Sequence, residues 1–214
     1  MTNKKKKITI SVIALLLVLV VSAYFYLPKM LADQVYPLKY EDLIRKYATK
    51  YGVDPAWVAA EIFVESRFDP KAQSGTGANG LGQMMQKTTY KTMLAEVGRP
   101  ANSDIYDPEV AIDTMTAHLR DLMVWSKGNR QYATAAYNLG TGGAARLGVN
   151  AVNNFGYVKK VDRAITVYST IYSGQLGYNS SPVQLQAIST DEKTNQVKGF
   201  IWAQFFQNIF RLSL

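Results

Sequence analysis

The chain has 214 residues, contains no Cys and carries a formal net charge of +8. The absence of Cys excludes a disulfide framework, a thiol nucleophile and a thiolate metal site. Half of the net charge comes from one run, residues 4–7, and no Lys/Arg stripe typical of nucleic-acid binding follows it. The mild positive balance of the remainder suits an anionic surface such as a cell wall or membrane, and equally an ordinary basic protein. No nucleic-acid partner is expected.

Residues 8–27 form an uncharged and mostly apolar run. At about 1.5 Å rise per residue, a helix of this length spans the roughly 30 Å hydrocarbon layer of a bilayer. The basic tail, residues 1–7, is expected to stay in the cytoplasm, and Tyr24 and Tyr26 lie where interfacial aromatic residues occur. The run is therefore predicted to be a single-pass signal-anchor in the plasma membrane, with the rest of the chain outside the cytoplasm.

A cleaved signal peptide is the alternative for this segment. The small residues Val21-Ser22-Ala23 offer a plausible cleavage site. The apolar run continues to Leu27, however, which is longer than the usual apolar core of a signal peptide and favours an uncleaved anchor. In either case the protein is exported. Since a lipid anchor on Cys is impossible, a plasma-membrane tether that faces the cell wall fits best, and a Gram-positive envelope is consistent with this expectation.

The first elements after the anchor are a spacer and two helices. Residues 28–39 are predicted to be a spacer, in which Pro37 discourages an early helix. Helical periodicity then covers residues 40–51. A second helix is predicted over about residues 55–66, because Asp54 offers an N-cap and a proline occupies the first helical position.

Helical patterns continue through the rest of a domain predicted to cover residues 40–176. No segment alternates cleanly enough to predict a strand, so the fold class is all-α, or α with a minimal β element. The expected elements are a Gly-rich loop over residues 69–87, a helix over residues 90–97, a helix that begins at Pro108 behind an Asp107 cap, a short helix over about residues 131–139 and a longer one over about residues 154–172.

The C-terminal part of the sequence changes character twice. Residues 177–197 are polar and are predicted to be a linker. Residues 198–214 place their large apolar side chains on one helical face, which predicts an amphipathic helix. This helix could dock on the preceding domain, lie in a membrane interface or bind a partner protein, although its few flanking charges weaken the interfacial alternative.

Glu65 is the candidate catalytic acid. It ends a predicted helix that is otherwise rich in Ala, Val, Ile and Phe, and it precedes the Gly-rich loop. Apolar surroundings favour the neutral form of a carboxyl group and raise its pKa, which a general acid near neutral pH requires. A single Glu near a helix end is more often a solvated residue, so the interpretation depends on the motifs around it.

Short motifs of catalytic type follow one another along residues 40–172. In chain order they are Glu65-Ser66, Gly80-Leu81-Gly82-Gln83-Met84, Asp107-Pro108-Glu109, Ala136-Tyr137-Asn138 and Tyr157-Val158. In this order and spacing the chain resembles the soluble lytic transglycosylase family, which is related in fold to goose-type lysozyme. The resemblance implies a lysozyme-like helical domain and an enzyme that acts on peptidoglycan glycan strands.

The implied reaction is a non-hydrolytic cut of the β-1,4 bond between N-acetylmuramic acid and N-acetylglucosamine. Glu65 is implied to protonate the leaving oxygen and then, as a carboxylate, to deprotonate the 6-hydroxyl of the sugar, which closes a 1,6-anhydro ring. No cofactor is implied, and a zinc site is not expected because His118 is the only His. The implied substrate-binding residues are Ser66, Gln83, Tyr137, Asn138 and Tyr157.

The sequence also departs from the family pattern. Gly82 stands where the family usually has Met, which is expected to widen or loosen the groove beside Gln83. Leu139 replaces the usual Ala after Ala-Tyr-Asn, and Asn153-Asn154 replace an acidic residue and Thr. These differences concern the sugar subsites.

Glu61 is a tempting second carboxylate, since its i, i+4 spacing places it on the same helix face as Glu65. A two-carboxylate glycosidase needs its carboxyl groups on either side of the scissile bond, and one helix face does not provide this arrangement. Glu61 is therefore interpreted as a structural or solvated residue that raises the pKa of Glu65 slightly. The rival functions are a lysozyme-like hydrolase that uses the same acid, and a catalytically idle glycan-binding module.

Overall fold

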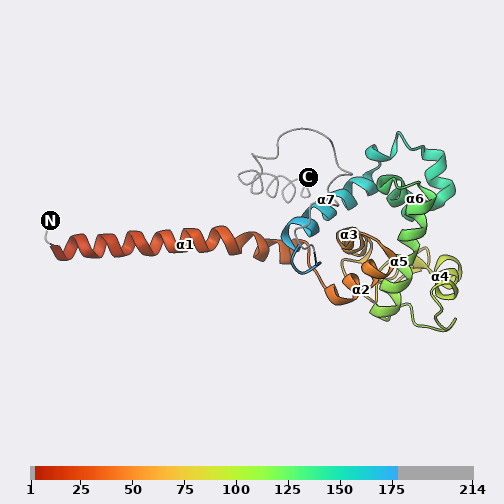
Figure 1. Ribbon diagram of the computed structural model, residues 1–214, viewed down its shortest axis with the longest axis horizontal. Coiled ribbons are helices and arrows are strands. Elements are labelled where there is room, and N and C mark those ends of the chain that lie inside the picture. The colour runs from red at the N-terminus through yellow and green to blue at the C-terminus, as the bar shows by residue number, and fades with distance from the viewer. Residues whose placement is uncertain (1–2, 178–214) are drawn as a thin grey trace.

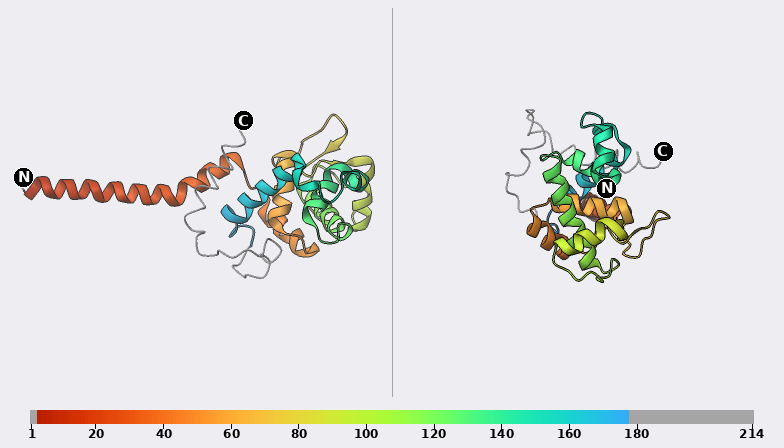
Figure 2. Two further views of the ribbon diagram at one scale, coloured as in Figure 1. Left: turned by 90° about the horizontal axis from the view of Figure 1, so that it is seen from above. Right: turned by 90° about the vertical axis from the view of Figure 1, so that its right-hand side faces the viewer.

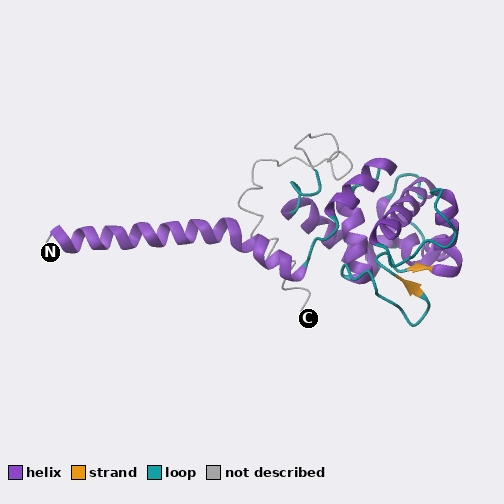
Figure 3. Ribbon diagram, turned by 90° about the horizontal axis from the view of Figure 1, so that it is seen from below, coloured by secondary structure: helices purple, strands orange, loops and turns teal. Residues whose placement is uncertain are grey.

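The computed structural model describes residues 3–177 and consists of a long N-terminal helix joined to a group of shorter helices (Figures 1 and 3). The predicted fold class is confirmed. The predicted C-terminal helix and nearly all of the predicted linker lie outside the described residues. The elements are α1 (Asn3–Val35), α2 (Glu41–Tyr51), α3 (Pro55–Ser66), β1 (Ala78–Asn79), β2 (Met84–Met85), a π-helical turn (Gln86–Tyr90), α4 (Lys91–Glu96), α5 (Pro108–Trp125), α6 (Arg130–Leu147), a 3-10 turn (Val152–Asn154) and α7 (Gly156–Ile171).

Two helices begin where their capping residues predict. The Asp54 carboxylate accepts a hydrogen bond from the backbone N–H of Ala56 at 2.8 Å, at the start of α3. The Asp107 carboxylate accepts from the backbone N–H of Glu109 at 2.8 Å, at the start of α5. Each helix has a proline in its first turn, where the missing N–H has no intrahelical partner to lose. These starts are specified locally, by two adjacent residues.

The N-terminal helix is longer than the predicted anchor. Within residues 3–177 no single helix is long and apolar enough by itself to cross a membrane. The segments Ile10–Tyr24 and Lys29–Val35 meet that requirement together as a pair bent by 44°. The bend falls next to Pro28, which cannot donate the backbone hydrogen bond of a straight helix. A membrane anchor over residues 8–27 stays a prediction.

The predicted spacer is attached to the domain, so the expectation of a simple connector over residues 28–39 is wrong. Tyr36 is almost fully buried and packs on the ring of Phe63, with 4.7 Å between ring centroids. The Tyr172 hydroxyl lies 2.7 Å from the Asp33 carboxylate and 2.8 Å from the Tyr36 carbonyl oxygen. The Tyr168 hydroxyl donates to a backbone carbonyl of the same segment. The folded unit therefore begins before residue 40 (Figure 2).

Helix α3 lies in the middle of the domain, packed along α7 and against α2. Residues 56–62 are all buried. A helix that is covered on every side must be apolar all round, and three Ala in this stretch let its neighbours approach closely. Since α3 is fixed from several directions, the side chains of its last turn are held in a defined place.

The remaining differences from prediction occur in irregular segments. The Gly-rich loop contains a two-stranded antiparallel hairpin, with Ala78 opposite Met85, that projects from the edge of the domain (Figure 3). Strands of two residues are too short to be recognised by alternation. The helix predicted over residues 131–139 continues to Leu147 across a break at Gly140, where φ is 70°. Glycine tolerates this conformation without steric cost.

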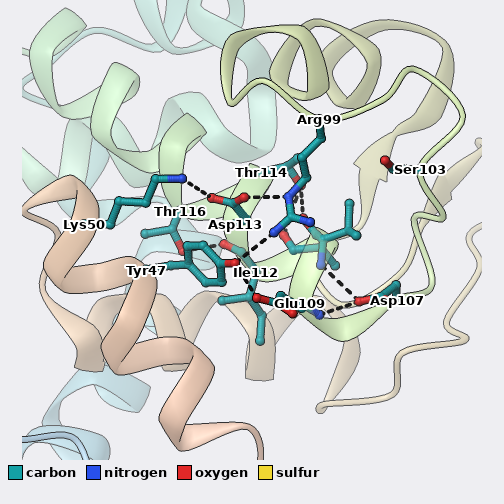
Figure 4. Close-up of polar contacts among 12 residues, drawn as sticks. Tyr47, Lys50, Arg99, Ser103, Asp107, Glu109, Ile112, Asp113, Thr114 and Thr116 are labelled. Carbon is teal, nitrogen blue, oxygen red and sulfur yellow. Dashed lines mark hydrogen bonds and ion pairs between the residues drawn. The ribbon is translucent and has the colours of Figure 1, made fainter.

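A buried carboxylate joins three parts of the domain (Figure 4). Asp113 of α5 accepts hydrogen bonds from Tyr51 at 2.6 Å and Lys50 at 3.1 Å, both on α2. Its other oxygen accepts from Nε of Arg99, which follows α4, at 2.6 Å. Arg99 also donates to the hydroxyl of Tyr47. A buried charge with three donors is well compensated, so the network fixes α2 and the segment after α4 on α5.

Candidate active site

The chain turns sharply directly after Glu65 and Ser66. Arg67 and Phe68 both adopt left-handed backbone conformations, with φ of 51° and 63°. Such conformations are unfavourable for bulky residues and persist only where the surroundings impose them. Here the Phe68 side chain is fully buried. The turn ends α3 and leaves the carboxyl group of Glu65 partly exposed at the helix end.

Tyr157 joins Glu65 to a second carboxyl group. The Tyr157 hydroxyl, from the first turn of α7, lies 2.5 Å from Oε1 of Glu65 and 2.6 Å from Oε2 of Glu61. The other oxygen of Glu61 accepts a hydrogen bond from Nε1 of Trp57 at 2.9 Å. Tyr157, which the family resemblance implies as a substrate-binding residue, thus contacts the candidate acid Glu65. Glu61 has no exposed surface, so the alternative of a solvated Glu61 is wrong.

Burial raises the pKa of both carboxyl groups. At Glu65 this effect exceeds the opposing hydrogen bond from Tyr157, so its pKa lies above the ordinary value. At Glu61 burial raises the pKa to about 8, opposed by the bond from Tyr157 and aided by the negative charge of Glu65. The predicted influence therefore acts in the other direction: the negative charge of Glu65 raises the pKa of Glu61.

Tyr137 of α6 closes another side of the site. Burial raises its pKa well above the ordinary value, and the charges of Glu65 and Glu61 raise it further, so the phenol keeps its proton. Its hydroxyl donates to the carbonyl oxygen of Gly82 at 2.6 Å. Its ring lies beside His118, with 5.5 Å between centroids. This bond holds the Gly-rich loop against α6.

Gly82 is closely packed, so the expectation of a wider groove at this position is wrong. A Cβ atom on Gly82 would lie 2.8 Å from the Tyr137 hydroxyl oxygen and 3.1 Å from Cβ of Met115. Both distances are shorter than ordinary van der Waals contacts. The missing side chain is replaced by a phenol from α6 and a methionine from α5, and not by open space.

We expect Gly82→Ala to lower the free energy of unfolding by about 1–3 kcal/mol, because the added methyl group overfills a packed position. It should also lower activity by displacing the Tyr137 hydroxyl. Urea unfolding and a glycan digestion assay measure the two effects. The matched control is Gly75→Ala in the same loop, where a Cβ meets nothing within 4 Å. Equal behaviour of the two variants would contradict the packing described for Gly82.

Ser66 and Gln83 use their donor groups within the protein. The Ser66 hydroxyl donates to the carbonyl oxygen of Ile62 at 3.0 Å. The Gln83 amide donates to the carbonyl oxygens of Gly80 at 3.0 Å and Ala72 at 3.1 Å, which fastens the loop. Both side chains are partly exposed. In this arrangement their oxygen atoms are the groups that remain free to accept a further hydrogen bond.

The structure thus brings Glu65, Tyr157 and Tyr137 together, with the loop of Gln83 tied to them through Gly82. Asn138 lies exposed on α6, just before the break at Gly140. Among residues 3–177 no three His, Asp or Glu side chains form a group that could hold a metal ion.

Sequence reasoning missed the buried part of this site. The hydrogen-bond partners of Glu61 are Trp57 and Tyr157, and the nearby Thr134 hydroxyl also lowers the pKa of Glu61. One signal was present in the sequence. Trp57 and Glu61 are four residues apart in a helix whose other positions up to Ile62 are all apolar. A Glu in such a helix indicates a buried and paired carboxyl group.

The fold and this site define a lysozyme-like helical domain in which, of the two carboxyl groups joined by Tyr157, only Glu65 is partly exposed. The chain belongs to the transglycosylase SLT domain family, whose profile matches residues 42–154. Tyr157 lies just beyond the matched segment, although its hydroxyl contacts the acid within it.

The relatives are longer than this chain. It is 38% identical over 119 residues to membrane-bound lytic murein transglycosylase C of Edwardsiella ictaluri, covering 51% of this chain and 33% of the relative. The protein of the same name from Serratia proteamaculans is 39% identical over 119 residues, with the same coverage. The chain thus spans about a third of the length of these relatives.

Solved structures agree with the fold. Lytic transglycosylase Slt from Pseudomonas aeruginosa superposes with a TM-score of 0.59 and 26% identity, covering 68% of this chain and 26% of that one. The 70 kDa soluble lytic transglycosylase of Escherichia coli gives 0.58 and 28%, covering 66% and 26%.

Proposed function

We propose that this chain is a membrane-bound lytic transglycosylase of peptidoglycan. It cleaves the β-1,4 bond between N-acetylmuramic acid and N-acetylglucosamine and leaves a 1,6-anhydro end. The observation that carries the proposal is the partly exposed carboxyl group of Glu65. Burial raises its pKa, and it accepts a hydrogen bond from the Tyr157 hydroxyl. Family membership and the names of the relatives support the same activity.

The reaction requires one group to act twice. Glu65 first donates its proton to the leaving glycosidic oxygen as that bond breaks. The resulting carboxylate accepts a hydrogen bond from Tyr157 and then removes the proton from the 6-hydroxyl, whose oxygen bonds to the anomeric carbon. The proton count of Glu65 is restored and no water is consumed.

The position of Glu61 favours this reaction over one with two carboxylates at the sugar. Glycosidases with a second carboxylate place it on the opposite side of the scissile bond, as nucleophile or as base for water. Glu61 is one turn from Glu65 on the same helix, is fully buried and contacts the same phenol. It therefore has no access to the substrate.

The remaining parts of the proposal concern binding and place. Gln83 and Ser66 contact the glycan through their oxygen atoms. Tyr137 and Asn138 orient the acid or an N-acetyl group. Residues 8–27 anchor the chain in the plasma membrane. The domain then faces the cell wall. Residues 198–214 provide a further contact with the membrane or with a partner protein.

The test is digestion of purified peptidoglycan by the full-length chain in detergent, with Glu65→Gln beside it. Released muropeptides are identified by mass spectrometry. We expect 1,6-anhydro ends from the wild type and none from the variant. Reducing ends that depend on Glu65 would instead identify a lysozyme-like hydrolase. Glycan binding by a folded wild type without any release would identify an idle binding module.

Tyr157→Phe is expected to lower the rate by about tenfold or more, because the Glu65 carboxylate loses the hydrogen bond that stabilises it. The same bond lowers the pKa of Glu65, so its removal raises that pKa. The acid form then persists to higher pH, and the alkaline limb of the pH–rate profile should move upward. An unchanged rate and profile would show that Tyr157 does not act on the acid.

A further inference from the structure

Three side chains of α3 and one phenol of α7 form a connected set of hydrogen bonds. The Tyr157 hydroxyl is 2.6 Å from Oε2 of Glu61 and 2.5 Å from Oε1 of Glu65. Trp57 donates to the remaining oxygen of Glu61 at 2.9 Å. Glu61 is completely buried, whereas Glu65 is partly exposed. The Tyr157 phenol therefore lies between one carboxyl group that is shielded from solvent and another that solvent can reach.

Counting protons restricts the state of this group. A phenol has one proton and can donate it to only one of the two carboxyl groups. Burial, with the charges of Glu61 and Glu65, raises the pKa of Tyr157 well above the ordinary value, so that proton stays in place. If both carboxyl groups were ionised, one of them would face a lone pair of the phenol oxygen. Both contacts are hydrogen bonds only when at least one carboxyl group carries a proton.

The surroundings decide which carboxyl group holds the proton. Tyr157 of α7 and Tyr137 of α6 are the titratable groups that face the pair, joined by the neutral side chains of Trp57 and Thr134. Among residues 3–177 no Lys or Arg forms an ion pair with either carboxyl group. An unpaired charge is much more costly inside the protein than at its surface, where water hydrates it. The proton therefore belongs on Glu61.

We propose that Glu61 is a positioning residue that stays protonated, donates a hydrogen bond to Tyr157 and thereby directs the Tyr157 hydroxyl onto Glu65. The proposal rests on the proposed glycan cleavage by Glu65. Glu61 does not touch the substrate. Its role is to support the Glu65 carboxylate that forms when the leaving oxygen is protonated, since each hydrogen bond in such a chain strengthens the next. The pKa of about 8 for Glu61 agrees with this assignment.

Two variants and a control separate this role from a merely structural one. Glu61→Gln keeps a donor for Tyr157 and an acceptor for Trp57, so the rate at neutral pH should fall by only about threefold. Glu61→Leu keeps neither, and the rate should fall by about tenfold or more. Glu96→Gln, on the exposed surface of α4, is the matched control and should behave as the wild type.

The pH–rate profile adds a readout that packing alone would not change. In the wild type the alkaline limb should steepen above about pH 8, where Glu61 ionises and competes for the Tyr157 proton. In Glu61→Gln this second ionisation is absent, so the limb should keep a one-proton slope. Identical limbs in the wild type and Glu61→Gln would overturn the proposal, as would equal rates for the Gln and Leu variants.

A measurement without substrate makes the two proposals distinguishable. With carbon-13-labelled Glu in the full-length chain, carboxyl NMR signals are followed against pH, and Glu61→Gln identifies the signal of Glu61. The expected result is a Glu61 carboxyl group that remains protonated at neutral pH. An ionised Glu61 at neutral pH would overturn the inference, whether or not the chain cleaves peptidoglycan. A protonated Glu61 in a chain without cleavage would instead overturn the proposed function alone.

Discussion

Glu65→Gln is expected to lower the rate of glycan release by about 10²- to 10⁴-fold, the usual contribution of a positioned acid or base. The amide can neither protonate the leaving oxygen nor accept the proton of the 6-hydroxyl. Its carbonyl oxygen can still accept the hydrogen bond from Tyr157, so the fold should be kept. The rate is measured as soluble muropeptide released from purified peptidoglycan.

The matched control for this substitution is again Glu96→Gln, which removes a carboxylate from exposed α4 and is expected to change the rate by less than about twofold. Urea unfolding of Glu65→Gln should give a midpoint at or above that of the wild type, since a partly buried charge has been removed. A folded Glu65→Gln that keeps more than about a tenth of the wild-type rate would exclude Glu65 as the acid.

The second large effect is on stability. Asp113→Asn is expected to lower the free energy of unfolding by about 3 kcal/mol, because removing one partner of a buried ion pair leaves the other uncompensated. Arg99, only about a quarter exposed, would lose its carboxylate, and Tyr51 would lose a strong acceptor. Urea denaturation measures the change. Asp121→Asn, which breaks a more exposed pair with Arg120, should lower the free energy by less than about 1 kcal/mol.

The contribution of Asp113 should also depend on pH. Burial alone would raise the pKa of this carboxyl group, but hydrogen bonds from Tyr51, Arg99 and Lys50 outweigh it and hold the pKa below its ordinary value. A carboxyl group whose pKa is lower in the folded than in the unfolded state stabilises the fold at pH values above its unfolded-state pKa, which is near 4 for Asp. This stabilisation is lost as the pH falls through the folded-state pKa. The stability difference between wild type and Asp113→Asn should therefore shrink below about pH 4. A difference that is constant down to pH 2 would contradict the network.

Features set by neighbouring residues could be predicted from the sequence. Asp54 and Asp107 specify where α3 and α5 begin, because each carboxylate caps an N–H only two residues away. The pairing of Glu65 with Tyr157 joins residues 92 positions apart. No local pattern contains that contact, and only the resemblance to a family singled out Tyr157 at all.

Three errors arose where distant elements meet. The small residue Gly82 predicted a wider groove, but the phenol of Tyr137 from α6 and the side chain of Met115 from α5 occupy that space. The sequence allowed Glu61 to be a solvent-exposed residue, because helical spacing does not show that Tyr157 of α7 covers it. The segment before residue 40 lacked a domain-like pattern, yet Tyr36 lies in the core. Each error concerns burial by a residue far away in the chain.

The attachment of this segment bears on the proposed anchor. Tyr172 contacts Asp33 and the Tyr36 carbonyl, and the ring of Tyr172 lies below the ammonium group of Lys29 at 5.1 Å. The end of α1 is therefore fixed on α7. If α1 spans the membrane, the catalytic domain is held close to the membrane surface and does not range freely through the wall.

The most direct test of the central claim is digestion of peptidoglycan by the full-length chain in water labelled with heavy oxygen. Transglycosylation closes the ring with the sugar's own 6-hydroxyl, so the new ends should be lighter than reducing ends by one water and contain no label. Heavy oxygen at the anomeric carbon of products that Glu65→Gln does not form would show that water completes the reaction. That result would contradict the account and make the enzyme a hydrolase.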